Sequence, residues 1–478
     1  MKMFNEVNTI LTSVDSYKVS HWLQYPENTE EAQFYIESRG GKFDEVVTAG
    51  PNYITKLLSQ PVTKQQVLFA QRLYKAHFGK DIFNLDSWLK IAELGYLPVK
   101  FSAIPEGTVV PVKNVVARFE SKGEFSWLAG WLETMAVRGV WYPSSVATLS
   151  RECKKVIDQY MTETSDLHGA EYDFVLHTRL HDFGARGASS SESAAIGGLA
   201  HLYNFMGTDT VEGMILAISM FEDAGSLLEN ENAEVKAAGI SIPAREHSTT
   251  ISYGRENEQD AYLNSVRTFG EGVYANVYDS WSFKTAVAKI IEYSSVVIAK
   301  GGTLVVRPDS GDMLDNIMYA LNKLGEIFGY EYNSKGYKVL SKHVRIIQGD
   351  EIHGPETIAR VLSWMESHKW AAENIAFGMG GGLLQEVTRD TQKYAMKMSA
   401  IKINGEWRGV YKCPEGAEWK KSKAGLLETI VKDGVYKTVN TLEQFIPDGW
   451  SPALVTYYDN GWVNESDTLQ VIRERARI

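Results

Sequence analysis

One pattern occurs four times between residues 273 and 387: a short apolar run, a polar loop and a stretch with helical spacing. The apolar runs are 273–277, 303–306, 344–347 and 375–377. This alternation predicts parallel strands joined by helical crossovers, so we expect an α/β fold with a β/α barrel-like domain. Each run is followed by Asp, Arg or Gly, and in β/α barrels that edge of the sheet holds the active site. Asp and Gly are also common turn and cap residues, but their fourfold recurrence favours a functional role.

The last of these loops is rich in glycine and reads Gly378-Met379-Gly380-Gly381-Gly382. It follows a predicted buried strand, and residues 383–387 after it resemble the start of a helix. Glycine lets the backbone reach positive φ and approach a ligand closely, while a helix N-terminus offers free N–H groups and a positive dipole end. We therefore expect this loop to bind phosphate, with a plain tight turn as the alternative.

The composition of the 478 residues is typical of a globular protein, with 44% hydrophobic and 23% charged residues. The net charge of −11 argues against general nucleic-acid binding, and no apolar run is long enough to predict a membrane span. Only two cysteines, Cys153 and Cys413, are present, and residues 1–6 lack the apolar core of a signal peptide. We expect a cytoplasmic protein that has neither a nucleic acid nor a membrane as a partner.

The domain organisation outside the alternating region is irregular. We expect an α+β domain at 1–170, the barrel at 171–389, and a tail at 390–478 that packs back on the N-terminal domain and makes that domain discontinuous. A turn at Pro105-Glu106-Gly107 and a hairpin turn at Asn404-Gly405 separate predicted strands. The expected elements outside the barrel are helices at 65–76, 125–136 and 468–477, and strands at 96–101, 108–119, 394–403 and 407–411.

Three further segments combine side chains that can do chemistry: 15–18 together with 37–39, then 181–187, and then 246–248. Each also has a plain structural interpretation. Asp15 can cap a helix, and Tyr17 can anchor a small apolar cluster. A lone histidine at a strand end is more often a packing residue than a catalytic one. The residues alone leave both interpretations open.

Taken in order, these segments resemble the nicotinamide phosphoribosyltransferase family of type II phosphoribosyltransferases. The matching motifs cover nearly the whole chain, at 15–18, 180–184, 207–210, 246–249, 307–311, 348–350, 374–378 and 420–423. The resemblance implies transfer of a 5-phosphoribosyl group from phosphoribosyl pyrophosphate to nicotinamide, giving nicotinamide mononucleotide and pyrophosphate in NAD salvage. It also implies a homodimer with active sites at the dimer interface, Mg²⁺ as cofactor and ATP as co-substrate.

The resemblance also implies substrate-binding residues. Phe183 and Tyr17 of the partner subunit match the pair that sandwiches the nicotinamide ring, and Asp209 matches the carboxylate that accepts from its carboxamide N–H. Arg307 matches a residue near the ring, and Asp309, Gly349 and Asp350 match residues at the ribose. Gly380 and Gly381 match residues at the 5′-phosphate, and Arg39, Arg389 and Lys397 match residues that complete the phosphate site from the other subunit. Arg186 matches a residue near the phosphates and the ring, Lys412 and Lys420 match residues at the pyrophosphate or nucleotide end, and Asp15 and His181 lie within matched segments.

The implied chemistry needs no strong base, because the pyridine nitrogen is nucleophilic and Mg²⁺ neutralises the pyrophosphate. Asp309 is expected to stabilise an oxocarbenium-like transition state and to hold Mg²⁺ through water. His247 matches the family's phosphorylated histidine, which couples ATP hydrolysis to synthesis. Either Glu246 or Asp279 can orient the His247 ring, and the sequence does not choose between them.

Three residues depart from the family pattern, because Met379, Ala395 and Ala275 stand where serines are familiar. Losing one hydroxyl donor should be tolerable, at about 0.5–1.5 kcal/mol for a typical hydrogen bond.

Three other functions compete with this one. Nicotinate phosphoribosyltransferase is the nearest, and Asp209 argues against it because a carboxylate repels that of nicotinate. A non-catalytic binding or signalling protein would not need His247, Asp309 and the glycine loop together. A phosphosugar lyase rests on fold analogy alone.

Overall fold

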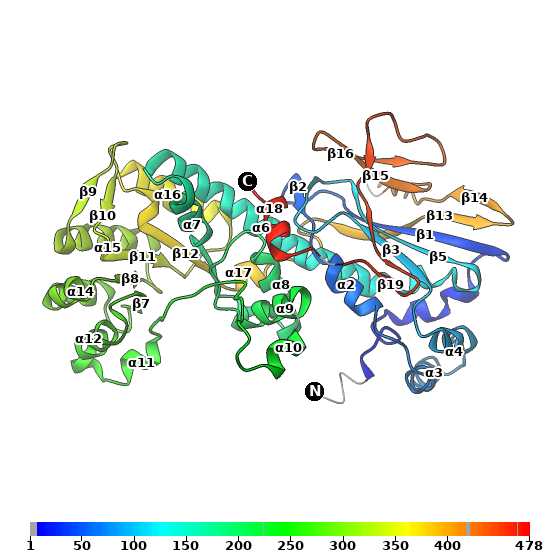
Figure 1. Cartoon of the computed structure of the whole chain (residues 1–478), viewed down its shortest axis with the longest axis horizontal. Coiled ribbons are helices and arrows are strands. Elements are labelled where there is room, and N and C mark those ends of the chain that lie inside the picture. Colours follow the sequence, from blue (N-terminus) through cyan, green and yellow to red (C-terminus); the bar gives the residue numbers. More distant parts are fainter. Residues whose placement is uncertain (1–6, 223, 417–420, 466) are drawn as a thin grey trace. The chain divides into compact units, whose positions relative to one another are not determined.

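The computed structural model describes residues 7–222, 224–416, 421–465 and 467–478, and the chain forms two compact units (Figure 1). Unit 1 contains Met1–Thr148 and Thr388–Ala476, and unit 2 contains Leu149–Val387 and Arg477–Ile478. Among the described helices, none has the length and apolar character needed to cross a membrane.

A parallel sheet organises unit 2. Its five strands run in the order β6-β12-β11-β8-β7, and every neighbouring pair is parallel. The bounds are Leu180–Asp182 for β6, Val273–Val277 for β7, Thr303–Arg307 for β8, Val344–Gln348 for β11 and Ile375–Met379 for β12. The four sequence repeats thus form four neighbouring strands, which confirms the expected parallel arrangement.

Single bridges close this sheet into a ring. Two short segments, 206–209 and 240–244, lie between the edge strands β6 and β7. The connections are the parallel bridges Asp182–Thr208, Gly207–Ile240 and Ala244–Ala275. Backbone hydrogen bonds support them, as where Thr208 N donates to Ile240 O at 3.1 Å. The result is a β/α barrel-like domain, as the sequence repeats predict.

The interior of the barrel is small. Ala275, Val305, Ile347 and Ala376, one from each of four strands, form a buried cluster. Phe183, just after β6, packs against this cluster. Since side chains alternate along a strand, the next inward positions toward the carboxyl edge are two residues farther on, where glycines occur in β12 and just after β11.

Helices surround the barrel strands. The bounds in unit 2 are α7 Gly169–His177, α8 Ser191–His201, α9 Val211–Phe221, α10 Ala224–Glu229, α11 His247–Ile251, α12 Glu258–Phe269, α13 Phe283–Ala288, α14 Ser294–Lys300, α15 Met313–Phe328, α16 Pro355–Ser367 and α17 Gly381–Leu384. A two-stranded hairpin joins β9 (Tyr330–Tyr332) to β10 (Lys338–Leu340). Helix α15 begins as the sequence predicts, with Asp312 accepting from Asp315 N at 2.8 Å.

Unit 1 is built on a seven-stranded sheet in the order β14-β13-β1-β5-β3-β18-β19. Its pairs are antiparallel, and the blue β1 lies between the cyan β5 and the orange β13 (Figure 1). The bounds are β1 Thr29–Ser38, β3 Val99–Ala103, β5 Val115–Lys122, β13 Tyr394–Ile403, β14 Glu406–Gly409, β18 Val455–Asp459 and β19 Trp462–Val463. The β13–β14 hairpin turns at Asn404 and Gly405, both with positive φ, as expected for this pair.

Smaller elements complete unit 1. Two further sheets join β2 (Glu45–Val47) to β4 (Val109–Pro111), and β15 (Leu427–Lys432) to β16 (Val435–Asn440) and β17 (Ser451–Pro452). The helices are η1 Ser16–Leu23, α2 Pro51–Leu58, α3 Lys64–Phe78, α4 Leu85–Leu94, α5 Leu128–Trp131 and α18 Leu469–Arg475, and the unit boundary falls within α6 Glu133–Thr164. Trp88, Trp127 and Trp131 meet edge to face in the core.

Three sequence expectations differ from the structure. The run 108–119 is two strands, because the chain turns at Lys113 with φ 69°. Gly378 and Met379 belong to β12 and not to the loop. The helix after the glycines is α17, which covers four residues only, because the N–H groups of residues 385 and 386 both donate to Gly381 O and close the turn.

Candidate active site

The carboxyl edge of the barrel gathers most of the expected site residues. Phe183 follows β6, Asp279 follows β7, Asp309 follows β8, Gly349 follows β11 and Gly380 follows β12. Parallel strands bring these ends to one rim. The other expected residues of unit 2 lie in the same strands or in loops that leave this rim: His181, Arg186, Asp209, Glu246, His247, Arg307, Asp350 and Gly381.

Phe183 lies against glycine backbone at the top of the barrel interior. Its N–H donates to Met379 O at 2.9 Å. A Cβ on Gly378 would lie 2.1 Å from Cε2 of the Phe183 ring, and one on Gly349 would lie 3.4 Å from it. Gly378 is therefore required by the packing of an aromatic ring and not by phosphate. None of the four glycines of the loop adopts a positive φ, so that part of the expectation is wrong.

Asp209 is held at the same rim by its main chain and its carboxylate. Its N–H donates to the carbonyl of Asp182 at 2.9 Å, one residue before Phe183. The Ser241 hydroxyl donates to Asp209 Oδ1 in a close contact. Burial lowers the pKa of His181, while the neighbouring Asp209 charge opposes this shift. No sequence motif marks Ser241, which lies in the segment that closes the barrel.

His247 and Asp279 form a direct polar contact at the rim. His247 Nε2 donates to Asp279 Oδ1 at 2.8 Å, and only 4% of the Asp279 side chain is exposed. The other oxygen, Asp279 Oδ2, accepts from Asp309 N at 3.1 Å and from Ser310 Oγ at 2.5 Å. The Asp279 carboxylate thus joins two loops of the rim.

Glu246 caps a helix. Its carboxylate accepts from Ser248 N at 2.8 Å and from the Ser248 hydroxyl, so it caps the short helix α11. These hydrogen bonds lower the pKa of Glu246. Of the two candidate orienters, Asp279 is the one that contacts the imidazole.

Asp309 pairs with a cation of its own strand end. Its Oδ2 lies 3.0 Å from Arg307 Nη2. The part of the chain that the structure describes contains no group of three His, Cys, Asp or Glu side chains placed to hold a metal ion. A metal held by the protein alone therefore does not fit this rim.

The glycine turn leaves backbone accessible at one point. A Cβ on Gly381 would meet no atom within 4 Å, whereas one on Gly382 would lie 3.0 Å from His353 Cα. Helix α17 is too short to build a substantial dipole, since the macrodipole sums over aligned peptide units. An anion at this turn would therefore rely on backbone N–H groups near Gly380 and Gly381.

The remaining expected residues lie in unit 1. Tyr17 is 58% exposed, and Asp15 Oδ2 accepts from Thr134 Oγ1 at 2.7 Å, so Asp15 does not cap η1 with its side chain. Arg389 is exposed near Asp390. The others here are Arg39, Lys397 and Lys412, and Lys420 lies outside the described residues.

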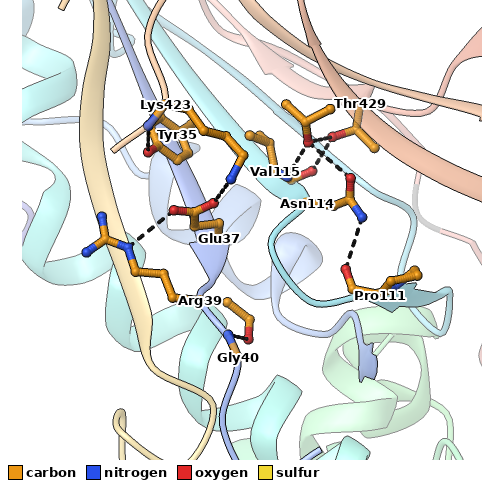
Figure 2. Close-up of polar contacts among 11 residues, drawn as sticks. Tyr35, Glu37, Arg39, Gly40, Pro111, Asn114, Val115, Lys423 and Thr429 are labelled. Carbon is orange, nitrogen blue, oxygen red and sulfur yellow. Dashed lines mark hydrogen bonds and ion pairs between the residues drawn. The ribbon is translucent and has the colours of Figure 1, made fainter. Parts of the chain in front are cut away.

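Arg39 and Lys397 belong to a basic cluster around two carboxylates, Glu37 and Glu133. Arg39 Nε lies 3.2 Å from Glu37 Oε1 (Figure 2), and Lys397 Nζ lies 3.5 Å from Glu133 Oε1. Burial lowers the pKa of Lys397, the Glu133 charge opposes this, and the positive charges of Arg39 and Lys412 lower it further. Sequence reasoning singled out the segments 37–39 and 420–423 but did not pair Glu37 with Lys423, because their contact spans 386 positions.

The three departures from the family pattern have distinct settings. Met379 is buried at the end of β12, Ala275 belongs to the barrel core, and Ala395 lies opposite Glu37 in the β1–β13 register.

Family models match two parts of this chain, and named relatives are similar to it over nearly its whole length. Residues 178–444 match the nicotinate phosphoribosyltransferase (NAPRTase) family, and residues 9–101 match the N-terminal domain of nicotinamide phosphoribosyltransferase. A protein of Xanthomonas campestris pv. campestris named nicotinamide phosphoribosyltransferase is 42% identical over 98% of both chains. One of Acinetobacter baylyi with the same name is 29% identical over 97% of this chain and 96% of its own.

Two solved structures share the fold. Nicotinate-nucleotide pyrophosphorylase from Pyrococcus furiosus has a TM-score of 0.62 at 15% identity, covering 98% of this chain and 94% of its own. Human nicotinic acid phosphoribosyltransferase has a TM-score of 0.54 at 16% identity, covering 97% and 92%. At these identities the likeness concerns the fold alone.

Proposed function

The chain belongs to the nicotinate phosphoribosyltransferase family and is a pentosyltransferase, and we propose that it transfers the 5-phosphoribosyl group of phosphoribosyl pyrophosphate to nicotinamide. The products are nicotinamide mononucleotide and pyrophosphate, as part of NAD salvage. The relatives from Xanthomonas campestris and Acinetobacter baylyi support nicotinamide as the acceptor by their names. A cytoplasmic location is part of the proposal, since two cysteines suit a reducing compartment.

The observation that carries the choice of acceptor is the Asp209 carboxylate at the barrel rim. Its backbone is tied to Asp182, next to Phe183, so the carboxylate and the ring belong to adjoining segments. A carboxylate accepts a hydrogen bond from a carboxamide N–H but repels a second carboxylate. Nicotinate, the rival acceptor, is disfavoured on this ground. The family membership likewise disfavours a phosphosugar lyase.

In the proposed reaction the pyridine nitrogen attacks C1 of the ribose. The bond from C1 to the pyrophosphate oxygen breaks, and pyrophosphate leaves with the electron pair. Asp309 is suited to stabilise the positive charge that develops on the ribose, because Arg307 fixes its position at the rim. The backbone at Gly380 and Gly381 is suited to the 5′-phosphate. Gly349 and Asp350 are proposed to contact the ribose hydroxyls.

Mg²⁺ enters this scheme with the substrate. The rim offers single carboxylates such as Asp309 and no set of three ligands among the described residues. Mg²⁺ is commonly bound through one or two carboxylates together with substrate phosphates. Asp309 is therefore proposed to contact a magnesium–pyrophosphate substrate through water.

ATP hydrolysis is proposed to proceed through His247. The contact from Nε2 to Asp279 leaves Nδ1 as the ring nitrogen available to attack the γ-phosphorus of ATP. The bond from the γ-phosphorus to the bridging oxygen breaks, ADP leaves, and water later releases phosphate from the histidine. Asp279 supports this role by orienting the ring and stabilising its positive charge.

The proposed assembly is a homodimer with shared sites. Tyr17 is exposed in unit 1, as expected of a residue that stacks on a ring in another subunit. In unit 2, α9 is rich in apolar residues, and Val211 and Ile215 are more than half exposed. Apolar surface of this kind is often covered in an assembly.

Product analysis tests the proposal. The purified chain is incubated with phosphoribosyl pyrophosphate, Mg²⁺ and either nicotinamide or nicotinate, and the nucleotide formed is identified. We expect nicotinamide mononucleotide, and Asp209→Asn should lower the ratio of kcat/KM for nicotinamide over nicotinate by roughly ten- to a hundredfold, as for a hydrogen bond to a charged group. Nicotinate mononucleotide as the wild-type product, or no nucleotide at all, would refute the proposed acceptor. Unchanged selectivity in the variant would remove Asp209 from that role.

A further inference from the structure

A buried carboxylate in unit 1 holds two cations from distant parts of the chain. Only 4% of the Glu37 side chain, on β1, is exposed. Its Oε1 accepts from Arg39 Nε at 3.2 Å, and its Oε2 forms a close ion pair with Lys423 Nζ. Figure 2 shows the carboxylate between the two cations. Burying a carboxylate is costly unless it is paired, and this one is paired twice.

Backbone contacts fix Lys423 in the same place. Lys423 N donates to the hydroxyl of Tyr35, two residues before Glu37, at 2.8 Å (Figure 2). Its neighbour Ser422 exchanges two hydrogen bonds with Lys412, each of 3.0 Å: Ser422 N donates to Lys412 O, and Lys412 N donates to Ser422 Oγ. Lys423 therefore contacts β1 twice, through its backbone N–H and through its ammonium group.

The cluster contains more cations than carboxylates. Glu133 pairs with Lys18 and Lys397, as Glu37 pairs with Arg39 and Lys423. Arg39 Nη2 is buried and makes no hydrogen bond of ordinary geometry with a described residue, although the Arg39 guanidinium lies close enough to the Tyr35 hydroxyl to oppose the rise that burial causes in the pKa of that hydroxyl. A buried guanidinium donor without an acceptor is costly, and a phosphate oxygen is a fitting partner.

We propose that Lys423 is an additional anion-binding residue of this cluster, and that Glu37 positions both Lys423 and Arg39 to hold a pyrophosphate group. The Glu37 carboxylate accepts the hydrogen bond of Arg39 Nε, so the terminal nitrogens of the guanidinium are proposed to bind the anion. Lys423 has three donors, of which Glu37 takes one. The proposal rests on the proposed function in naming the pyrophosphate group of the substrate as the anion.

A merely electrostatic role for Glu37 makes the opposite prediction. If Glu37 only neutralises its neighbours, Glu37→Gln adds one net positive charge and should tighten anion binding. If Glu37 positions the two cations, the same substitution frees them and weakens binding. Glu37→Asp keeps the charge but shortens the side chain, so a loss in that variant reports geometry.

The matched control lies on the same strand. Glu31 also pairs with two lysines, Lys402 at 3.1 Å and Lys122 at 3.3 Å. It is six residues from Glu37, which corresponds to about 20 Å along a strand. Glu31→Gln therefore removes the same kind of contact without touching the basic cluster.

Calorimetric titration of the full-length chain with inorganic pyrophosphate tests the proposal, with thermal unfolding as the check on folding. We expect saturable binding by the wild type, binding roughly ten- to a hundredfold weaker in Glu37→Gln, and weaker binding in Glu37→Asp and Lys423→Met. Glu31→Gln should stay within about twofold of the wild type. If the Glu37 variants do not fold, Lys423→Met decides.

Three results would overturn the proposal. They are wild-type or tighter binding by Glu37→Gln, unchanged binding by Lys423→Met, and absence of pyrophosphate binding by the wild type. Because the titration needs no turnover, a chain that binds pyrophosphate in this way but makes no nucleotide refutes the proposed function and not this inference. The reverse outcome, with nucleotide made but Glu37→Gln binding normally, refutes this inference alone.

Discussion

The barrel rim of unit 2 and the basic cluster of unit 1 are built in opposite ways. At the rim, most of the functional residues follow a parallel strand within two or three positions, and Asp279 after β7 contacts His247 at the start of α11. In the basic cluster, Glu37 on β1 pairs with Lys423, which lies 386 positions later in the loop before β15. The rim offers carboxylates, an aromatic ring, glycine backbone and an arginine paired with Asp309, whereas the cluster has more cations than carboxylates.

This difference suggests a division of labour. The groups of the rim suit a neutral ring, a ribose and its developing positive charge, while the cations suit phosphate oxygens. Arg307 at the rim is paired with Asp309. The proposed homodimer brings the cations of the cluster to each rim from a second chain.

The largest effect should come from His247, on the rim. His247→Ala should abolish ATP hydrolysis, because Nδ1 is the proposed phosphoryl acceptor. A slower, ATP-independent synthesis should remain, since the nucleophile and the leaving group belong to the substrates. Labelling with γ-labelled ATP should give an acid-labile, base-stable phosphoryl group on the wild type and none on the variant. Normal ATP hydrolysis by the variant would exclude this role.

A contrast between two carboxylates sharpens the same test. Asp279→Asn should slow ATP hydrolysis far more than Glu246→Gln, because only Asp279 contacts the imidazole. Glu246→Gln should weaken mainly the cap of α11 and leave the imidazole contact in place. Equal losses of activity in the two variants would contradict the assigned contacts.

The sequence predicted the rim better than the cluster for a physical reason. Strand, loop and helix repeat locally, so Asp279, Asp309 and Gly349 fall at one edge once parallel strands are expected. The sequence does not choose between Glu246 and Asp279 as the partner of His247, since distance in sequence does not measure distance in space. The pairing of Glu37 with Lys423 has no local signature at all.

The sequence predicts the place of the glycine loop correctly but explains one of its glycines, Gly378, wrongly. Its place after a barrel strand was foreseen, but Gly378 is required by the Phe183 ring, a contact between strands that no single motif reveals. The helix expected after the loop is only the four-residue α17, because the N–H groups of residues 385 and 386 both donate to Gly381 O. A run of glycines indicates that other atoms can approach the backbone of the loop closely, but it does not indicate which atoms these are.

A smaller effect concerns the free energy of unfolding, which should depend on pH because Asp182 is buried at the rim. Burial raises the pKa of Asp182 to about 6, although Gly184 N donates to its Oδ1 at 2.7 Å. A carboxyl with a raised folded-state pKa binds more protons folded than unfolded, so stability falls as pH rises from about 4 through 6. Asp182→Asn should remove this loss, which amounts to at most about 3 kcal/mol above pH 6.

Thermal unfolding between pH 4.5 and pH 8 measures the effect. The melting temperature of Asp182→Asn should exceed that of the wild type by a few degrees at the higher pH, and the difference should shrink toward the lower pH. A constant difference across this range would show that Asp182 does not titrate as its burial predicts.

The most direct test of the account asks whether one active site needs both regions from different chains. Tyr17→Ala and Phe183→Ala chains, each inactive alone, are mixed under conditions of verified subunit exchange, and synthesis of nicotinamide mononucleotide is measured. We predict recovery to about a quarter of the wild-type rate, because half of the dimers are mixed and each mixed dimer holds one intact site of two. No recovery despite confirmed exchange would contradict the shared site.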